Sequence, residues 1–241
     1  MSNWLADFKA QFILNFIKGD KWKWLVDGLF TTLRIAFFAV ILGIVIGVII
    51  SVIRSSYDMN YKKMRGPMKP VLRVLNFLSK IYLTVIRGTP VVVQLMIMYY
   101  VIFASSTNAI GIATMAFGIN SGAYVGEIFR SGIMSIDKGQ FEAGRSLGFN
   151  YMQTMIYVIV PQALKNVLPS LCNEFITLLK ETSVAGYVTI TDLTRAGDLI
   201  RGNTFSAFMP LIAVALIYLV LVMILTSLVG KLERKLRTSD H

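Results

Sequence analysis

Residues 35–53 read IAFFAVILGIVIGVIISVI, which is a run of 19 residues without a charged side chain. Because a helix needs about 20 apolar residues to cross a bilayer, this stretch predicts a membrane-spanning helix. The rest of the chain is also apolar: 55% of its 241 residues are hydrophobic, 15% are charged, and the mean hydropathy is +0.64. A typical soluble domain has about 25% charged residues. We therefore expect an all-α membrane protein.

Further uncharged stretches follow this one along the chain. Residues 88–126 are long enough for two crossings joined by a turn at 104–108, and residues 202–230 supply another. A less apolar stretch, 155–179, contains Lys165 and Glu174. The sequence therefore predicts five transmembrane helices, at about 25–54, 74–103, 109–133, 155–180 and 207–230.

The residues before the first span have the pattern of a helix that lies on the membrane surface. Four apolar residues recur at helical spacing: Leu5, Phe8, Phe12 and Phe16. One apolar face is typical of interfacial helices, and Trp22 with Trp24 follows as an aromatic anchor. We divide the chain into an interfacial segment (1–24), a transmembrane domain (25–235) with a loop at about 138–154, and a tail (236–241).

Lysine and arginine are distributed unevenly among the segments that connect the spans. With the N-terminus outside, the inner segments 54–73, 127–165 and 231–241 carry 14 of them, and the outer segments carry six. Positive residues favour the cytoplasmic side, so we expect the N-terminus outside and the C-terminus in the cytoplasm. The same rule accounts for the net charge of +11 without a nucleic-acid partner, and we expect none.

The composition also argues against several classes of enzyme. The chain has one cysteine, Cys172, and one histidine, His241, so it cannot assemble a usual Cys/His metal site or a buried Ser-His or Cys-His pair. The sequence also lacks a G-x-x-x-x-G-K-[ST] phosphate loop. We expect this chain to have no catalytic residue, no metal, no cofactor and no ATP site of its own.

Polar side chains form stripes on two of the predicted helices. The fourth helix carries Asn166, Ser170, Asn173, Glu174, Thr177 and Glu181, and the third carries Asn120, Tyr124, Glu127 and Ser131. Such stripes indicate either a water-accessible path or hydrogen bonds that hold helices together. The candidate path residues are Ser170, Asn173, Glu174, Thr177, Tyr124 and Glu127. Glu127 has a second interpretation, an ion pair with Arg130 three residues later.

A helix break is predicted at Arg87-Gly88-Thr89-Pro90. Pro90 cannot donate a helical hydrogen bond, and Gly88 loosens the backbone beside it. Arg87 has two interpretations. It belongs either to a functional element in the inner half of the membrane or to a packing kink whose charged end reaches the interface.

The segment before the fourth span predicts a short helix on the cytoplasmic side. It reads GQFEAGRSLGFN from Gly139 to Asn150, and Gly148 can end the helix. Glu142 lies near its start, where a negative charge suits the helix dipole. A short helix fixed between two spans would transmit a push to both of them, although an ordinary loop helix has the same pattern.

At these residues the chain resembles the permease subunits of type I ABC importers. Their signature is EAA, three residues, Gly, nine residues, then I-x-L-P. Its counterparts here keep that spacing: Glu142, Ala143, Gly144, Gly148, Val158, Val160 and Pro161. Gly144, Val158 and Val160 are mild departures from the signature. Further motifs at 86–90, 123–130, 139–140, 161–163 and 179–183 are similar to polar amino-acid permeases of the histidine, glutamine and arginine type.

The resemblance implies a type I permease fold of five spans that pairs with a second permease, identical or homologous, in the bacterial cytoplasmic membrane. It implies two ATPase subunits that bind ATP and Mg, and an extracytoplasmic amino-acid-binding protein. The ATPases would contact the coupling-loop residues Glu142, Ala143, Gly144, Leu147 and Gly148. Arg87, Gly88, Thr89, Pro90 and Pro161 would be structural motif residues. The expected function is a translocation path for polar amino acids, coupled to ATPases in trans.

Other functions stay open at this point. A permease for cystine or another small polar solute would have the same pattern. An ion-coupled secondary transporter normally has more spans and internal repeats, and a membrane scaffold has no need of polar stripes within its spans.

Overall fold

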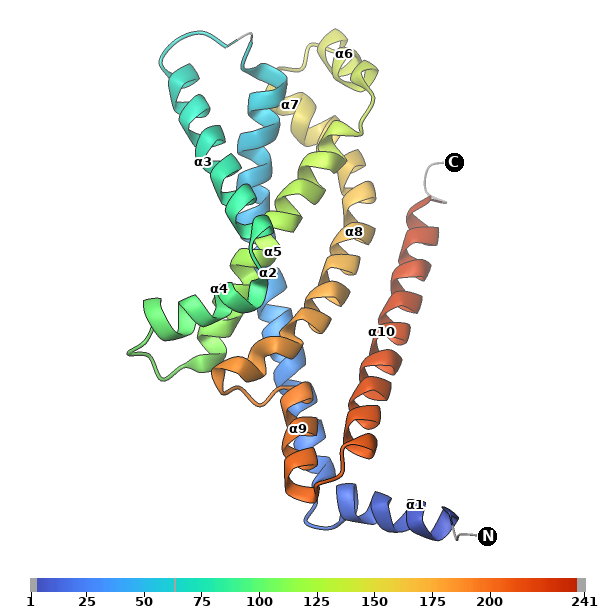
Figure 1. The fold of residues 1–241 in the computed structure, drawn as a ribbon. Helices are drawn as coiled ribbons and strands as arrows, with labels where there is room; N and C mark the ends of the chain where they lie inside the picture. Colours follow the sequence, from blue (N-terminus) through green and yellow to red (C-terminus); the bar gives the residue numbers. More distant parts are fainter. Residues whose placement is uncertain (1–3, 63, 238–241) are drawn as a thin grey trace. The chain divides into compact units, whose positions relative to one another are not determined.

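The computed structural model describes residues 4–62 and 64–237, and every regular element in these ranges is a helix (Figure 1). The helices are α1 (Trp4–Phe12), α2 (Trp22–Asn60), α3 (Met68–Gly88), α4 (Val91–Ile97), α5 (Ala109–Met134), α6 (Lys138–Ser146), α7 (Tyr151–Thr154), α8 (Val160–Glu181), α9 (Leu193–Thr204) and α10 (Phe208–Arg237). His241 and the end of the predicted tail, 238–241, lie outside the described residues.

Among the described helices, four segments are long and apolar enough to cross a membrane: Trp22–Asn60, Ala109–Met134, Tyr151–Val188 and Phe208–Leu236. The bent pair Met68–Gly88 and Val91–Ile102 adds a fifth if it forms one span. The expected single helix at 74–103 is therefore divided. Thr89, at φ −125° and ψ 146°, has left the helical region before Pro90, because the residue before a proline avoids that region.

The helices belong to two compact units. The first contains the described residues up to Phe38 together with Val91–Phe117 and Ile176–Ser227. The second contains Ala39–Pro90, Gly118–Phe175 and the described residues from Leu228 onward. Each unit has its own core.

The first unit packs the N-terminal residues against α9 and α10. Its core contains Phe16, Leu25, Leu193, Ala196, Ile200 and Val214. The expectation that Phe16 shares a membrane-facing stripe with Phe8 and Phe12 is wrong, because Phe16 is only 8% exposed while the other two are exposed. The α-helix ends at Phe12, and a π-helical turn, Ile13–Ile17, changes the direction of the following side chains. Fully buried Asn15 accepts a hydrogen bond of 2.7 Å from Thr204.

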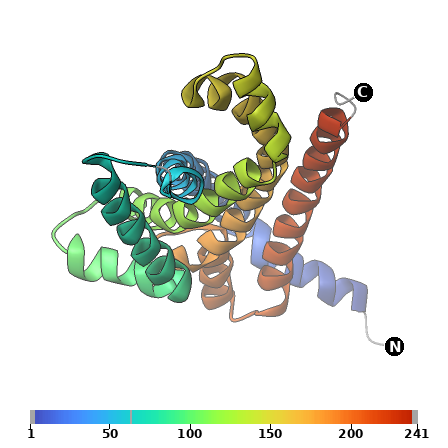
Figure 2. The ribbon, with the colours of Figure 1, turned by 90° about the horizontal axis from the view of Figure 1, so that it is seen from above.

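The second unit is organised by close contact between α2 and α5. A Cβ atom at Gly47 would lie 2.5 Å from Val125 Cγ1, and one at Gly122 would lie 2.8 Å from Ile46 Cγ2. Small residues at such positions let two membrane helices approach closely. In Figure 2, which looks nearly along α2, both α3 and α5 run beside it. Tyr82 of α3 donates a 2.6 Å hydrogen bond to the Ile119 carbonyl and fixes α3 to α5.

Candidate functional site

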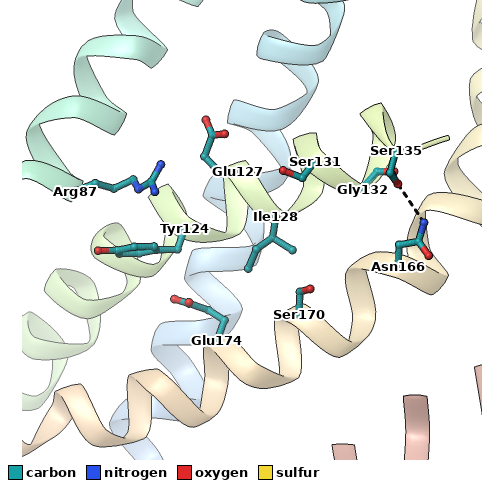
Figure 3. A pocket seen from close by; sticks show the side chains of 10 residues that line it. All are labelled: Arg87, Tyr124, Glu127, Ile128, Ser131, Gly132, Ser135, Asn166, Ser170 and Glu174. Atoms are coloured by element: carbon teal, nitrogen blue, oxygen red, sulfur yellow. Dashed lines mark hydrogen bonds between the residues drawn. The ribbon is translucent and has the colours of Figure 1, made fainter. Parts of the chain in front are cut away.

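Within the second unit, α3, α5 and α8 enclose an open cavity of about 570 Å³. Ten residues line it: Arg87, Tyr124, Glu127, Ile128, Ser131, Gly132, Ser135, Asn166, Ser170 and Glu174. Figure 3 shows that Tyr124, Glu127 and Ser131 come from α5, whereas Asn166, Ser170 and Glu174 come from successive turns of α8. The cavity therefore brings one face of α5 opposite one face of α8, with Arg87 at the end of α3.

Charged groups of both signs face this cavity. The Arg87 guanidinium carbon lies 5.4 Å from the centre of the Tyr124 ring, which is within the range of a cation–π contact. Glu174 Oε1 accepts a 2.8 Å hydrogen bond from Ser121 Oγ of α5. The cavity can thus offer a cation and a carboxylate to a ligand that carries both charges.

Glu127 is held by a neighbouring arginine, as one of its two interpretations proposed. Arg130 donates to Glu127 Oε2 at 3.1 Å from Nε and at 3.0 Å from Nη2. Arg130 Nη1 also contacts Asp58 of α2 at 3.2 Å. The Glu127 charge is therefore largely compensated by Arg130 within the protein.

The structure brings four of the six candidate path residues to this cavity, namely Tyr124, Glu127, Ser170 and Glu174. Asn173 instead lines a smaller cavity of about 330 Å³ with Lys165 and Glu233. Successive residues of a helix lie about 100° apart, so Asn173 and Glu174 face different directions. Thr177 is exposed and belongs to the first unit. A role for Asn173 and Thr177 in transport stays a prediction.

Sequence reasoning placed Arg87 among the structural motif residues, but the structure adds it to the cavity. The helix break predicted after Arg87 does form, and Thr89 Oγ1 donates a 2.8 Å hydrogen bond to the Val85 carbonyl. The break ends α3 at Gly88, one residue after Arg87. The Arg87 side chain extends from this helix end to the Tyr124 ring. A lone arginine beside a glycine and a proline carries no sequence signal for this contact, because Tyr124 is 37 residues away.

The predicted cytoplasmic loop helix is α6. Asp137 caps it by accepting a 2.6 Å hydrogen bond from the Gly139 N–H. Gly144 is buried, and a Cβ atom there would lie 2.7 Å from Thr154 Cγ2. Gly148 has a φ of +81°, a conformation that favours glycine. Asn150 and Gln153 then form a capping box that starts α7.

These contacts leave one side of α6 and the residue that follows it exposed. Glu142, Ala143 and Leu147 are all exposed, and Leu147 is 74% exposed. On the other side, Phe141 packs on the cluster formed by Ile133, Ile159 and Ala163. Pro161 lies inside the continuous helical segment Tyr151–Val188, directly after the π-helical turn Met155–Ile159 and the residue Val160. The helix is thus anchored to the ends of α5 and α8, while Glu142 and Ala143 of the signature are exposed and Gly144 is buried.

Several helices that are apolar enough to span a membrane, a polar cavity and an exposed loop helix are features expected of a membrane permease. The model of the family described as "Binding-protein-dependent transport system inner membrane component" matches residues 71–238, and the chain belongs to this family. This result confirms the predicted kind of protein, a permease subunit of an ABC importer. Membership of the family implies ATPase and binding-protein partners.

Similar proteins span nearly the whole chain. The "Arginine transport system permease protein ArtQ" of Bacillus subtilis (strain 168) is 36% identical over 219 residues, covering 90% of this chain and 94% of that protein. The "Glutamine transport system permease protein GlnP" of Escherichia coli (strain K12) is 38% identical over 169 residues, covering 68% of this chain and 77% of that protein.

Solved structures agree with the predicted type I permease fold. A crystal structure of "an amino acid ABC transporter with histidines" is 38% identical, has a TM-score of 0.79, and is matched over 91% of this chain and 98% of that one. The MetNI methionine ABC transporter in an inward-facing form has a TM-score of 0.74 over 88% of this chain and 95% of that one. Its identity is 20%, so this second likeness shows the fold alone.

Proposed function

We propose that the chain forms the translocation path for polar amino acids in an ATP-driven importer. The observation that carries the proposal is the placement of Arg87 and Glu174 on one open cavity of about 570 Å³. An amino acid carries a carboxylate and an ammonium group, and this cavity presents one group of each opposite charge. The names of the similar proteins, which specify arginine and glutamine, support the same substrate class.

In this proposal the side chains of the cavity have separate tasks. Arg87 binds the substrate carboxylate, because a guanidinium presents paired donors that match two carboxylate oxygens. Glu174 binds the ammonium or a cationic side chain, and Ser121 holds its carboxylate in place. Ser170 and Ser131 offer hydroxyl groups along the wall. Arg130 keeps Glu127 from competing for the substrate ammonium.

Energy for transport comes from partner subunits in this scheme. Two ATPase subunits bind ATP and Mg and press on the exposed residues of α6, namely Glu142, Ala143 and Leu147. The anchoring of α6 to α5 and α8 then transmits the movement to the helices that line the cavity. A second permease completes the path, and an extracytoplasmic binding protein delivers the amino acid. The N-terminus lies outside and the C-terminus in the cytoplasm.

The experiment is uptake into vesicles that contain the chain with its ATPase, its binding protein and internal ATP. We expect arginine, glutamine or histidine to accumulate only when ATP and the binding protein are both present. Cystine and a neutral sugar serve as comparison solutes. Accumulation of the sugar but of no amino acid would contradict the proposed substrate class, and uptake driven by an ion gradient without ATP would contradict the energy source.

A further inference from the structure

The connection between α2 and α3 and the first turns of α3 carry a group of basic residues that we call the basic patch: Lys62, Arg65, Lys69 and Arg73. Three of these side chains are exposed and Lys69 is half-buried. The sequence has no Asp or Glu between Asp58 and Glu127. Among the residues that the structure describes, none of the four forms an ion pair with a carboxylate. The positive charge of the patch is therefore left for a partner outside the chain.

The acid that precedes the patch does not neutralise it. Asp58 lies one turn before Lys62, but its carboxylate contacts Arg130 of α5 at 3.2 Å. Other basic helix ends in the described chain contain their own acids. Lys231, Arg234 and Lys235 of α10 include Glu233 among them, and Lys138 and Arg145 of α6 flank Glu142. The patch therefore differs from these helix ends in being positive throughout.

The patch lies at the same end of the second unit as α6. A cavity of about 460 Å³ is lined both by Asp58 and Asn60 at the end of α2 and by Glu142 and Arg145 of α6. Figure 1 shows the α2–α3 connection and α6 at this common end of the unit. If α6 faces the cytoplasm, as proposed above, the basic patch faces the cytoplasmic leaflet.

The aromatic side chains beside the patch are of the kind expected at the level of lipid headgroups. Tyr57 and Tyr61 stack with their ring centres 4.3 Å apart. Lys69 Nζ lies 5.0 Å from the centre of the Tyr61 ring. Tyrosine is enriched where a protein passes from the hydrocarbon core to the headgroups, so we expect Lys69 to lie at the level of the lipid phosphates.

The outer face of α3 supplies the apolar half of the same surface. This helix buries only one stripe, consisting of Leu72, Asn76, Ser79 and Leu83. Most of its other apolar side chains are exposed, namely Met68, Val71, Val74, Leu75, Phe77, Leu78, Ile81 and Val85. Lys69 and Arg73 lie one helical turn apart at the start of this helix and next to these apolar residues. A partner must therefore combine negative charge with long apolar chains.

We propose that the basic patch binds the headgroups of anionic phospholipids, whose acyl chains lie along the outer face of α3. Phosphate oxygens accept charge-assisted hydrogen bonds from lysine and arginine. Juxtamembrane basic residues are attracted to anionic leaflets, and each contributes roughly a fivefold gain in affinity. The inference does not depend on the substrate of the permease.

The test measures which lipids stay bound to the complex of the chain with its ATPase. The complex is reconstituted in nanodiscs of phosphatidylcholine with about a third phosphatidylglycerol, then extracted, and its retained lipids are quantified by mass spectrometry. One variant combines K62Q, K69Q and R73Q. The matched control combines K231Q, R234Q and K235Q, which removes the same number of charges from the end of α10. Co-purification of the ATPase verifies that both variants assemble.

We expect the wild type and the α10 control to retain phosphatidylglycerol in preference to phosphatidylcholine. The patch variant should lose this preference by roughly fivefold or more. Equal retention of phosphatidylglycerol by the patch variant and the wild type would overturn the proposal. The same result is expected if another subunit covers the patch, so that outcome also contradicts lipid binding there. If the patch variant fails to assemble, the wild-type complex is tested alone at increasing KCl concentrations. Its preference for phosphatidylglycerol must weaken as KCl is raised, and a salt-independent preference would contradict the proposal. Displacement of the lipid by inorganic phosphate, but not by chloride at equal ionic strength, would assign the patch to soluble phosphate and overturn the lipid assignment.

Discussion

Ser121 on α5 donates a hydrogen bond of 2.8 Å to the Glu174 carboxylate on α8, across 53 residues of sequence. Both residues belong to the second unit, and Glu174 lines the open cavity of that unit with Arg87 and Tyr124. The bond fixes a carboxylate on the wall of a polar cavity in a membrane protein. Charged groups in such places usually face water or a ligand.

Replacing Glu174 by glutamine should separate ligand binding from structural support. The amide keeps the shape and can still accept from Ser121, but it cannot form a charge-assisted bond with an ammonium group. We expect uptake of a cationic or zwitterionic amino acid at limiting concentration to fall roughly 10- to 100-fold, which corresponds to about 1.5–3 kcal/mol. Uptake and melting temperature are measured on the same preparation. A large loss of thermal stability with poor assembly would instead show that Glu174 holds helices together.

Gly148 should be essential for coupling because it joins α6 to α7 at a φ of +81°. A β-branched residue in that region costs about 1–2 kcal/mol, so Gly148→Val should displace α6 from its partner. We expect amino-acid uptake and the stimulation of ATPase activity by the loaded binding protein to decrease together. Gly230→Val of α10 is the matched control, since a Cβ atom there meets nothing within 4 Å. Normal uptake and normal ATPase stimulation in Gly148→Val would contradict the assignment of this loop as the ATPase contact.

The orientation in the membrane follows from labelling two exposed loop residues from opposite sides. Ser106 lies between the second and third predicted spans, and Ser146 ends α6. In a Cys172→Ser background, we expect Ser106→Cys to react with a membrane-impermeant maleimide on intact cells. Ser146→Cys should react only after the membrane is opened. Reaction of both cysteines on intact cells, or of Ser146→Cys alone, would refute the proposed orientation.

Asp192 in the first unit should make stability depend on pH. Its buried carboxylate accepts hydrogen bonds from the Thr194 and Arg195 N–H groups at 2.9 and 3.1 Å and caps α9. Burial raises the pKa of Asp192 above its ordinary 3.8, although these bonds oppose the shift. The folded state therefore holds the proton more tightly than the unfolded state. Stability from this group is present at low pH and is lost as the pH rises through the folded-state pKa.

Asp192→Asn keeps an oxygen at the cap and removes the titration. The melting temperature of the wild type, measured relative to that of this variant, should fall as the pH rises from about 4 to 7. A difference that stays constant over this range would show that Asp192 does not contribute in this way.

Patterns within single segments of the sequence predicted much of the fold. The uncharged run at 35–53 lies within α2, and the short helix expected in the Gly139–Asn150 segment forms as α6, with Gly148 just beyond its end. The exceptions depend on contacts between distant segments. Phe16 has the spacing of a membrane-facing residue, but the π-helical turn before α2 directs it into a core with α9 and α10.

The candidate site was partly predictable, because residues that share one face of a single helix can be recognised from their spacing in the sequence. Ser170 and Glu174 share a helical face, and their spacing placed them on one wall of the cavity. Helical spacing could not separate Asn173 from that wall, because which edge of a polar stripe faces the cavity depends on how α5 packs against α8. Nor could it place Arg87 beside Tyr124, since that contact depends on the packing of α3 against α5.

The most direct test of the account is whether a substrate in transit covers the cavity wall. Ser170 lines both this cavity and the smaller one of about 330 Å³, whereas Asn173 lines only the smaller one. Ser170→Cys and Asn173→Cys are both made in the Cys172→Ser background. The rate of alkylation by a small water-soluble reagent is measured during ATP-driven turnover, with the binding protein either loaded with amino acid or empty. The account predicts that loading slows the reaction at Ser170→Cys and leaves Asn173→Cys unchanged. Equal rates at Ser170→Cys with loaded and empty binding protein would contradict the claim that this cavity is the translocation path.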